Sequence, residues 1–128
     1  MTAIQNLSAP LGRLLLSLIF VVSGVGKIGA YAGTQAYMDS MGVPGVLLPL
    51  VIALEILGGL AIIVGWQARI AAFLLAGFCL LSAVLFHGNI GDQGEQIQFL
   101  KNLGLAGGFL LIVAHGAGAW SLDNRRGA

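Results

Sequence analysis

The stretch from Val46 to Val64, VLLPLVIALEILGGLAIIV, decides the fold of this chain, because it is an unbroken apolar segment with a single carboxylate, Glu55, near its middle. At a rise of about 1.5 Å per residue, it is long enough to cross a hydrocarbon core of about 30 Å as one helix. A glutamate at that depth costs about 2.5–3.5 kcal/mol on insertion scales, so we expect its side chain to face a partner or a wet cavity. The segment therefore predicts a membrane-spanning helix with an inward-facing acid.

Two glycines follow Glu55 on the same face of this helix, since Gly58 and Gly59 lie three and four positions later. Because they carry no side chains, another helix can approach closely beside the carboxylate. Two interpretations of Glu55 stay open. It belongs to a functional site, or it forms an ion pair that only holds one helix to another.

The composition of the whole chain supports a membrane protein. Of 128 residues, 58% are hydrophobic and only 9% are charged, and the mean hydropathy is +0.95. Soluble domains carry about 25% charged residues, so we predict an integral membrane protein with one domain over residues 1–128. The net charge of +1 does not favour nucleic acid as a partner. Cys79 is the only cysteine, which excludes a disulfide within the chain and a two-cysteine thiol relay.

Three further apolar segments complete a predicted four-helix bundle. They cover about residues 11–28, 70–86 and 99–114. We expect Ser8 to cap the first of these helices and Pro10 to lie in its first turn, where a missing N–H costs nothing. The predicted fold class is thus all-α, a polytopic protein with four transmembrane helices.

The connector of residues 29–45 separates the first two spans. Its stretch TQAYMDSM, residues 34–41, predicts about two turns of helix with Thr34 as N-cap. Such a helix would lie in the membrane interface. A plain loop is the alternative.

Four spans place both termini on the same side of the membrane, and the charges indicate which side. The terminal side carries Arg13, Arg69, Arg125 and Arg126. The opposite side carries Lys27 and Lys101 together with Asp39, Asp92 and Glu95. By the positive-inside rule the termini are therefore cytoplasmic. The four arginines are predicted to anchor the cytoplasmic edge, where Arg13 or Arg69 can pair with lipid phosphate.

Each predicted span contributes an ionisable side chain to the outer half of the bundle. We predict a pocket that opens outward and is lined by Lys27, Glu55, His87, Lys101 and Asn102. Two cations facing one carboxylate leave a local positive excess, which suits an anionic or carbonyl-bearing ligand. Structural alternatives remain: Lys27 as an interfacial anchor, His87 as a helix cap, and Glu55 with Lys101 as a buried structural pair.

Glycines predict where the helices pack closely, within the bundle or against other chains: Gly24, Gly58, Gly59, Gly107 and Gly108. Metal binding is not expected. His87 and His115, the two histidines, are predicted at opposite ends of the bundle, so one haem cannot use both. We expect no metal and no covalently bound cofactor.

Several short motifs follow one another along nearly the whole chain. They are Arg13, Ser23-Gly24 with Lys27, Glu55 before Gly58-Gly59, Gly65 with Arg69, His87, Lys101-Asn102, and the closing Gly116-Ala117-Gly118-Ala119-Trp120-Ser121-Leu122-Asp123. In this order they resemble the DoxX family. The resemblance implies a four-helix inner-membrane protein of bacteria that is associated with quinone-linked or thiol-linked oxidoreductase systems. The two-cysteine redox motif of some related four-helix proteins is absent.

Two functions from different classes follow. The first is a small subunit of such an oxidoreductase system, with a pocket for a quinone-type or other small ligand. In that role Lys101 and His87 would polarise a carbonyl oxygen, and Glu55 would hold Lys101 or relay a proton. The alternative is a non-enzymatic assembly or scaffold subunit, with Glu55 and Lys101 as a buried structural pair. Whether a reaction is catalysed stays open, and the expected partners are the lipid bilayer and other membrane subunits or a second copy of the chain.

Overall fold

The computed structural model describes residues 2–88 and 91–125. Within this part of the chain every element of regular secondary structure is a helix, and four helical segments are long and apolar enough to cross a membrane. These are α1 (Ala3–Gly29), the continuous segment Gly45–Val64, α5 (Ala68–Phe86) and α6 (Gln93–His115). The predicted all-α fold with four membrane-spanning helices is therefore confirmed.

The first span begins earlier than the sequence analysis predicted. Thr2 caps α1: its hydroxyl accepts a hydrogen bond from the Gln5 N–H (3.2 Å), and the Gln5 side chain accepts one from the Thr2 N–H (3.0 Å). Ser8 is therefore not the N-cap, and Pro10 lies inside the helix. The reciprocal pair satisfies two free N–H groups at the new start, which stabilises an earlier beginning.

The second span is not one regular helix. It consists of η1 (Gly45–Leu47), α3 (Leu48–Ala53), the π-helical turn η2 (Leu54–Gly58) and α4 (Gly59–Val64). The π-helical turn contains Glu55, whose side chain is buried. A π turn adds a residue to one turn of helix and is found frequently at functional sites.

The connector between the first two spans contains the helix α2 (Tyr31–Ser40). It begins before Thr34, which is not its N-cap, because the Thr34 hydroxyl donates to the Ala30 carbonyl oxygen within the helix (2.8 Å). Asp39 ties α2 to the next span, since its Oδ1 accepts from the Gly45 N–H (2.7 Å). Gln35 donates to the Gly45 carbonyl oxygen (3.2 Å), so α2 is held at the start of the second span from two sides.

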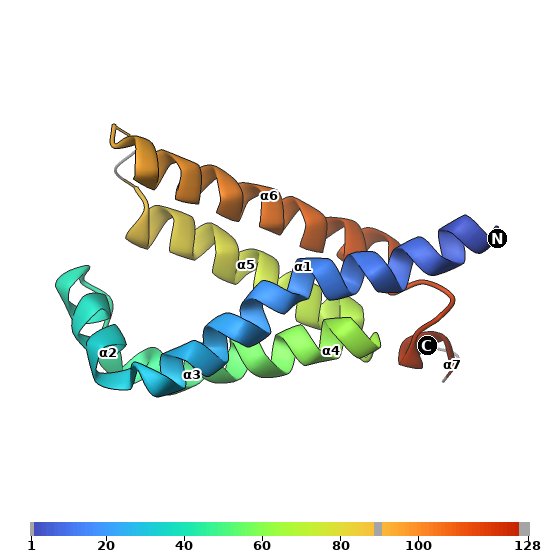
Figure 1. The fold of residues 1–128 in the computed structure, drawn as a ribbon, viewed down its shortest axis with the longest axis horizontal. Helices are drawn as coiled ribbons and strands as arrows, with labels where there is room; N and C mark the ends of the chain where they lie inside the picture. Colours follow the sequence, from blue (N-terminus) through green and yellow to red (C-terminus); the bar gives the residue numbers. More distant parts are fainter. Residues whose placement is uncertain (1, 89–90, 126–128) are drawn as a thin grey trace.

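The four spans form two pairs (Figure 1). α1 packs along α3, η2 and α4, and α5 packs against α6. The pairs lie close together toward the end that carries both termini and separate toward the end that carries α2. Ile62, Leu75 and Phe109 are fully buried where the pairs meet. Both termini lie at one end of the bundle, as four spans require.

Four of the five predicted packing glycines lie where helices touch. An added Cβ would be 2.6 Å from Ile56 Cγ1 at Gly24, 2.8 Å from Val21 Cγ2 at Gly59, 3.2 Å from Leu16 at Gly108, and 3.4 Å from Leu75 at Gly58. Gly107 differs, because a Cβ there would meet nothing within 4 Å. Gly107 is thus not a packing position within this chain, since it lies on the face of α6 turned away from the other helices.

Arg13 corrects the expectation of a lipid-facing anchor. Arg13 is only 3% exposed. Nη1 donates to the carbonyl oxygens of Ile62 (3.1 Å) and Ile63 (2.9 Å), and Nη2 donates to that of Trp120 (2.6 Å). The last carbonyls of a helix lack partners inside it, so Arg13 caps the C-terminal end of α4 and holds the C-terminal segment to it.

The other three arginines predicted as anchors differ from Arg13 in their positions. Arg69 is exposed in the first turn of α5, at the end of the bundle that carries the termini, which suits an anchor. Arg125 is the last residue of α7 (Leu122–Arg125). Arg126 lies outside the described residues. The anchoring role of these arginines stays a prediction.

The C-terminal segment returns to cap α5. Asp123 accepts hydrogen bonds from the backbone N–H groups of Gln67 (2.7 Å) and Ala68 (2.9 Å), and its own N–H donates to the Gly65 carbonyl oxygen (2.8 Å). The turn between α4 and α5 uses positive φ angles at Gly65 (74°) and Gln67 (48°). Asp123 therefore does from far along the sequence what an N-cap residue normally does locally.

Replacing Asp123 with alanine is expected to lower the free energy of unfolding by about 1–2 kcal/mol, the usual value of an N-cap side chain. Asp123→Asn keeps one acceptor oxygen and should lose about half as much. Chemical unfolding of the purified protein in detergent measures both. An alanine variant as stable as the unmodified protein would contradict the capping role.

Candidate functional site

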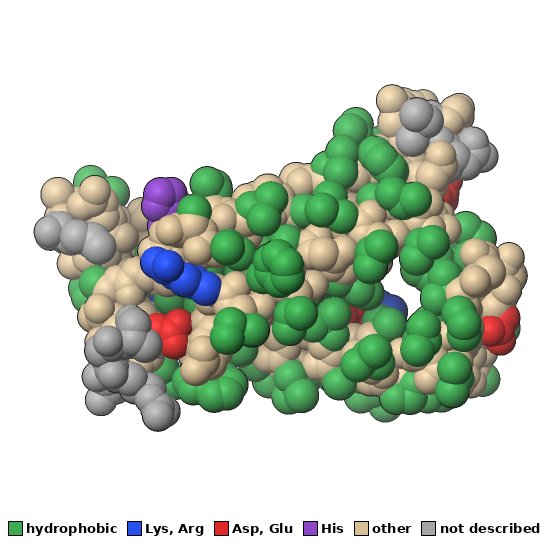
Figure 2. Space-filling view, turned by 180° about the vertical axis from the view of Figure 1, so that it is seen from behind, with side chains coloured by type: hydrophobic (Ala, Val, Ile, Leu, Met, Phe, Trp, Pro, Cys, Tyr) green, Lys and Arg blue, Asp and Glu red, His purple; other side chains and the backbone are tan. Residues whose placement is uncertain are grey.

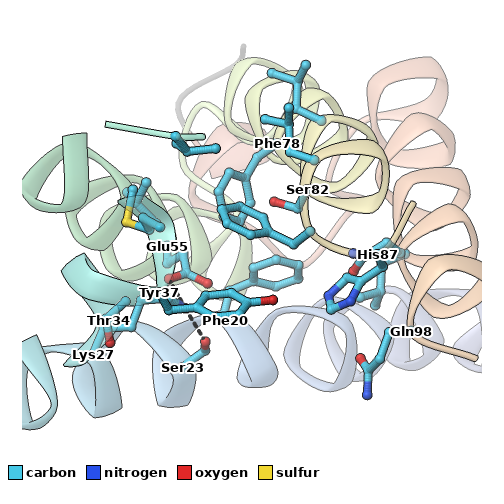
Figure 3. Close-up of a pocket in the computed structure, with 18 of the residues that line it drawn as sticks. Phe20, Ser23, Lys27, Thr34, Tyr37, Glu55, Phe78, Ser82, His87 and Gln98 are labelled. Carbon is cyan, nitrogen blue, oxygen red and sulfur yellow. Dashed lines mark hydrogen bonds and ion pairs between the residues drawn. The ribbon is translucent and has the colours of Figure 1, made fainter. Parts of the chain in front are cut away.

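A cavity of about 360 Å³ lies at the end of the bundle where the two helix pairs separate (Figure 3). Its walls come from α1, α2, α3, η2, α5 and α6. This volume falls in the range of about 300–1,000 Å³ typical of small-molecule sites. The structure brings all five predicted pocket residues to this cavity: Lys27, Glu55, His87, Lys101 and Asn102.

A buried ion pair forms one polar end of the cavity. Lys27 Nζ lies 2.8 Å from Glu55 Oε1, and the two side chains are 26% and 4% exposed. Lys27 also donates to the Ser23 hydroxyl (2.7 Å). Gly24 allows this approach, because a Cβ at that position would lie 3.3 Å from Glu55 Cβ. Glu55 thus faces inward, toward α1.

The partner of Glu55 differs from the prediction, because both functional hypotheses from the sequence placed Glu55 beside Lys101. Lys101 lines the cavity from α6 but is exposed, and no ion pair joins it to Glu55 in the described part of the chain. The reason lies in the packing, since α1 contacts η2 directly whereas α6 packs mainly on α5. The lysine on α1 therefore reaches the carboxylate.

His87 forms the opposite polar end. Figure 3 shows His87 and Gln98 across the pocket from Lys27 and Glu55. His87 Nδ1 lies 2.9 Å from Glu95 Oε2, and Glu95 itself does not line the cavity. The contact with Glu95 was not predicted, because the fourth span was expected to begin at about residue 99, whereas α6 already begins at Gln93. The spacing of Asp92 and Glu95 was the available signal, because Asp92 accepts from the Glu95 N–H (3.0 Å) as an N-cap.

Aromatic and aliphatic side chains form the walls between these two ends. Tyr37 of α2 stacks on Phe86 of α5, with ring centroids 5.5 Å apart and an interplanar angle of 21°. Phe20 packs edge-on against Phe78 at 6.5 Å. Figure 3 shows the Ser82 hydroxyl directed into the same space. These residues were not predicted as pocket walls, since aromatic residues at such positions resemble ordinary core residues.

The cavity has an opening on the surface of the bundle. Hydrophobic side chains cover the middle of the molecule, and a hollow opens beside α2, with basic and acidic side chains at its edge (Figure 2). This is the end of the molecule where the cavity lies. The cavity therefore opens on the side of the bundle.

The donor set of the cavity suits an oxygen-bearing organic ligand. Lysine and histidine N–H groups can donate to a carbonyl oxygen, and the carboxylate of Glu55 and a neutral imidazole nitrogen can accept a proton. In residues 2–88 and 91–125 no group of three or more His, Cys, Asp or Glu side chains is placed to hold a metal ion. The geometry thus offers hydrogen bonding and proton exchange.

Comparison with known proteins identifies the relatives of this chain. The DoxX family model matches residues 9–88. The inner membrane protein YqjF of Escherichia coli K12 is 48% identical over 123 residues, which cover 96% of this chain and 95% of that protein. The inner membrane protein YphA of the same organism is 35% identical over 122 residues, covering 90% and 87%.

A third relative carries a functional name. "Putative oxidoreductase CatD" of Bacillus subtilis 168 is 32% identical over 85 residues, which cover 63% of each chain. No solved structure matches this chain significantly. The family model covers more than half of the chain, and YqjF matches nearly all of it. This chain is therefore a membrane protein that belongs to the DoxX family.

Proposed function

We propose that the cavity binds a quinone-type ligand and that the protein is a small membrane subunit of a quinone-linked oxidoreductase system. The observation that carries this proposal is the buried Lys27–Glu55 pair at one end of an otherwise mainly apolar, aromatic-walled cavity. Of the two systems that the family resemblance implies, the thiol-linked one fits less well. Cys79 is the only cysteine and is buried.

The hydrogen bonds of Lys27 leave room for a ligand. A lysine ammonium has three N–H donors. Within the described residues one of them donates to Ser23 Oγ, and the ammonium is paired with the carboxylate of Glu55 by charge. A further N–H is available to a carbonyl oxygen in the cavity. Glu55 holds the ammonium in place and compensates its charge in an apolar environment, where an isolated charge would be costly.

The size and the walls of the cavity suit a substituted ring. A volume of about 360 Å³ holds a quinone ring and the first part of a side chain. The Tyr37–Phe86 stack and the Phe20–Phe78 pair present ring surfaces on which a flat ligand can pack. A longer isoprenoid tail would leave through the hollow beside α2 toward the acyl chains.

The relatives and the charges support the cellular setting of this proposal. Two relatives are E. coli inner membrane proteins, and one carries the word oxidoreductase in its name. We infer that both termini are cytoplasmic. The end of the bundle that carries the termini also carries Arg69 and Arg125, whereas the other end carries the acidic residues Asp39, Asp92 and Glu95. The cavity would then open in the outer half of the membrane.

Binding of ubiquinone-1 to the purified protein in detergent tests the proposal. We expect a saturable site, and we expect Ser82→Trp to weaken it at least about tenfold, because an indole at this position fills the cavity. Leu74→Trp is the matched control on the same helix, since Leu74 is exposed and lies outside the cavity. Intrinsic fluorescence quenching or calorimetry measures the Kd. No saturable binding, or equal binding by both variants, would refute the proposal.

A role as an assembly or scaffold subunit is the second candidate. The observation that favours it is the uncovered face of α6, where an added Cβ would meet nothing within 4 Å at Gly104 or at Gly107. Glycines on a free apolar face allow close packing of a helix from another subunit or a second copy. A purely structural protein has no saturable ubiquinone site, so the same titration separates the two roles.

A further inference from the structure

The second polar end of the cavity consists of His87 with Glu95 behind it. His87 lines the cavity at the end of α5, and its Nδ1 lies 2.9 Å from Glu95 Oε2. Nδ1 points toward Glu95, which is not one of the residues that line the cavity. The other ring nitrogen, Nε2, bonds in a different direction and is the one that can meet a ligand in the cavity. Figure 3 shows the ring reaching in from the side opposite Lys27 and Glu55.

The carboxylate determines what Nε2 can do. A histidine whose Nδ1–H is held by a carboxylate has its orientation and tautomer fixed. In the neutral ring, Nε2 is then an acceptor and can receive a hydrogen bond from a ligand hydroxyl. In the protonated ring, Nε2–H is a donor to a ligand carbonyl oxygen, and the Glu95 carboxylate stabilises the positive charge. The His87 side chain can therefore bind either a ligand hydroxyl or a ligand carbonyl oxygen, depending on whether its ring is neutral or protonated.

We propose, on the basis of the quinone-type site above, that the His87–Glu95 pair is a proton-exchanging anchor that distinguishes the oxidised from the reduced form of the ligand. When the carbonyl form binds, His87 Nε2 takes up a proton from solvent and donates it to the carbonyl oxygen as a hydrogen bond. When the hydroxyl form binds, the neutral ring accepts the ligand's O–H and no proton is taken up. No bond within the ligand changes and no electron moves in this step.

Charged and titratable side chains face His87 from several of the elements that line the cavity. From α6, Glu95 is the carboxylate in contact with His87, while Lys101 lines the cavity as an exposed cation. From α2, Tyr37 lines the same cavity as a neutral phenol. Lys27 and Glu55 neutralise each other across the cavity. Of these charged groups, Glu95 is thus the one that contacts the His87 ring.

Calorimetric titration in two buffers of different ionisation enthalpy counts the protons directly. At pH 7.5, where a typical histidine is mostly neutral, we expect uptake of about 0.5–1 proton per ubiquinone-1 bound. Ubiquinol-1, kept reduced without oxygen, should bind with uptake close to zero. Between about pH 6.5 and pH 8 the quinone affinity should fall about three- to tenfold, while the quinol affinity changes less than about twofold.

Two variants locate the effect. His87→Gln keeps a hydrogen-bonding group near the position of Nε2 but cannot be protonated. Proton uptake and the pH dependence of quinone affinity should therefore disappear, while quinone binding weakens by no more than about tenfold. His115→Gln is the matched control, because it removes the other histidine, which lies at the far end of α6 and outside the cavity. This control should retain the uptake.

The outcomes separate this inference from the proposed function. Saturable quinone binding without proton uptake, or uptake that survives His87→Gln, would overturn the role of His87 and leave the quinone site standing. Absence of any saturable site for either ligand form would overturn both. Uptake that is lost in His87→Gln and retained in His115→Gln supports the anchor.

Discussion

Replacing Lys27 with methionine is expected to lower the free energy of unfolding by about 3–5 kcal/mol, whereas Glu55→Gln should lower it by only about 1–2 kcal/mol. The difference follows from exposure, since the side chain of Glu55 is 4% exposed and that of Lys27 is 26% exposed. Without the lysine, the carboxylate stays buried and unpaired. Without the carboxylate, the long side chain of Lys27 can still extend its ammonium toward polar surroundings.

The double variant Lys27→Met, Glu55→Gln provides the decisive measurement. Replacing both members of a buried pair by neutral groups is often nearly neutral for stability. We therefore expect the double variant to be much more stable than Lys27→Met alone, with a coupling free energy of at least about 2 kcal/mol. Unfolding in mixed detergent micelles gives all four corners of the cycle. Additive effects would show that the two residues do not stabilise each other.

Lys101→Met serves as the matched control for this cycle. Lys101 lines the same cavity but is exposed and makes no ion pair with Glu55 in the described structure. Its replacement should change stability by less than about 0.5 kcal/mol, as is usual for surface positions. A large effect of Lys101→Met, with strong coupling to Glu55→Gln, would restore the pair that the sequence analysis considered and refute the pair with Lys27.

The same double variant separates structure from function at this site. If the pair only joins two helices, the double variant regains stability and nothing else is lost. If it also binds a ligand, the double variant is stable but has lost the ammonium donor that faces the cavity. In that case ubiquinone-1 should bind at least about tenfold more weakly, the usual effect of removing a charged hydrogen bond of about 1.5–3 kcal/mol.

The inward orientation of Glu55 could be predicted from the sequence, but its partner could not. The cost of a carboxylate in lipid is a property of the residue and its depth, and both can be read from the apolar run around it. Which lysine reaches Glu55 depends on which helices are neighbours. Helical periodicity gives the face of each helix but not the order of the four helices around the bundle.

The boundaries of the helices show a second limit. Residues 88–98 are hydrophilic and fall outside the predicted spans, yet α6 begins at Gln93 and extends beyond its apolar part. Hydropathy marks the part of a helix that lies in lipid, not the part that continues past it. For this reason the contact between His87 and Glu95 was not predicted, although His87 was predicted as a pocket residue. The π turn at Glu55 also leaves no sequence signature, because a single inserted residue is set by packing.

Arg13 was singled out from the sequence, but its structural role was predicted wrongly. An arginine near the end of a span normally marks the membrane interface. Here the helix extends ten residues before it, from Ala3, so Arg13 lies inside the bundle. Its guanidinium holds three carbonyl groups from two segments that are distant in sequence. A flat group with five donors in a fixed geometry is suited to this task.

Replacing Arg13 with methionine should therefore lower the free energy of unfolding by about 3–5 kcal/mol, because three carbonyl oxygens in buried and half-buried positions lose a charged donor. Arg13→Lys keeps the charge but cannot reproduce the forked geometry, so we expect it to recover less than half of the loss. Arg69→Met is the control at the same end of the bundle, since Arg69 is exposed, and it should cost less than about 0.5 kcal/mol. Unfolding in detergent measures the three variants together. Limited proteolysis adds a local test, because the C-terminal segment that begins after α6 should become accessible to protease in Arg13→Met well before the helices unfold. If Arg13→Lys proved as stable as the unmodified protein, charge alone would suffice, and the carbonyl contacts would not be the reason for the burial of Arg13.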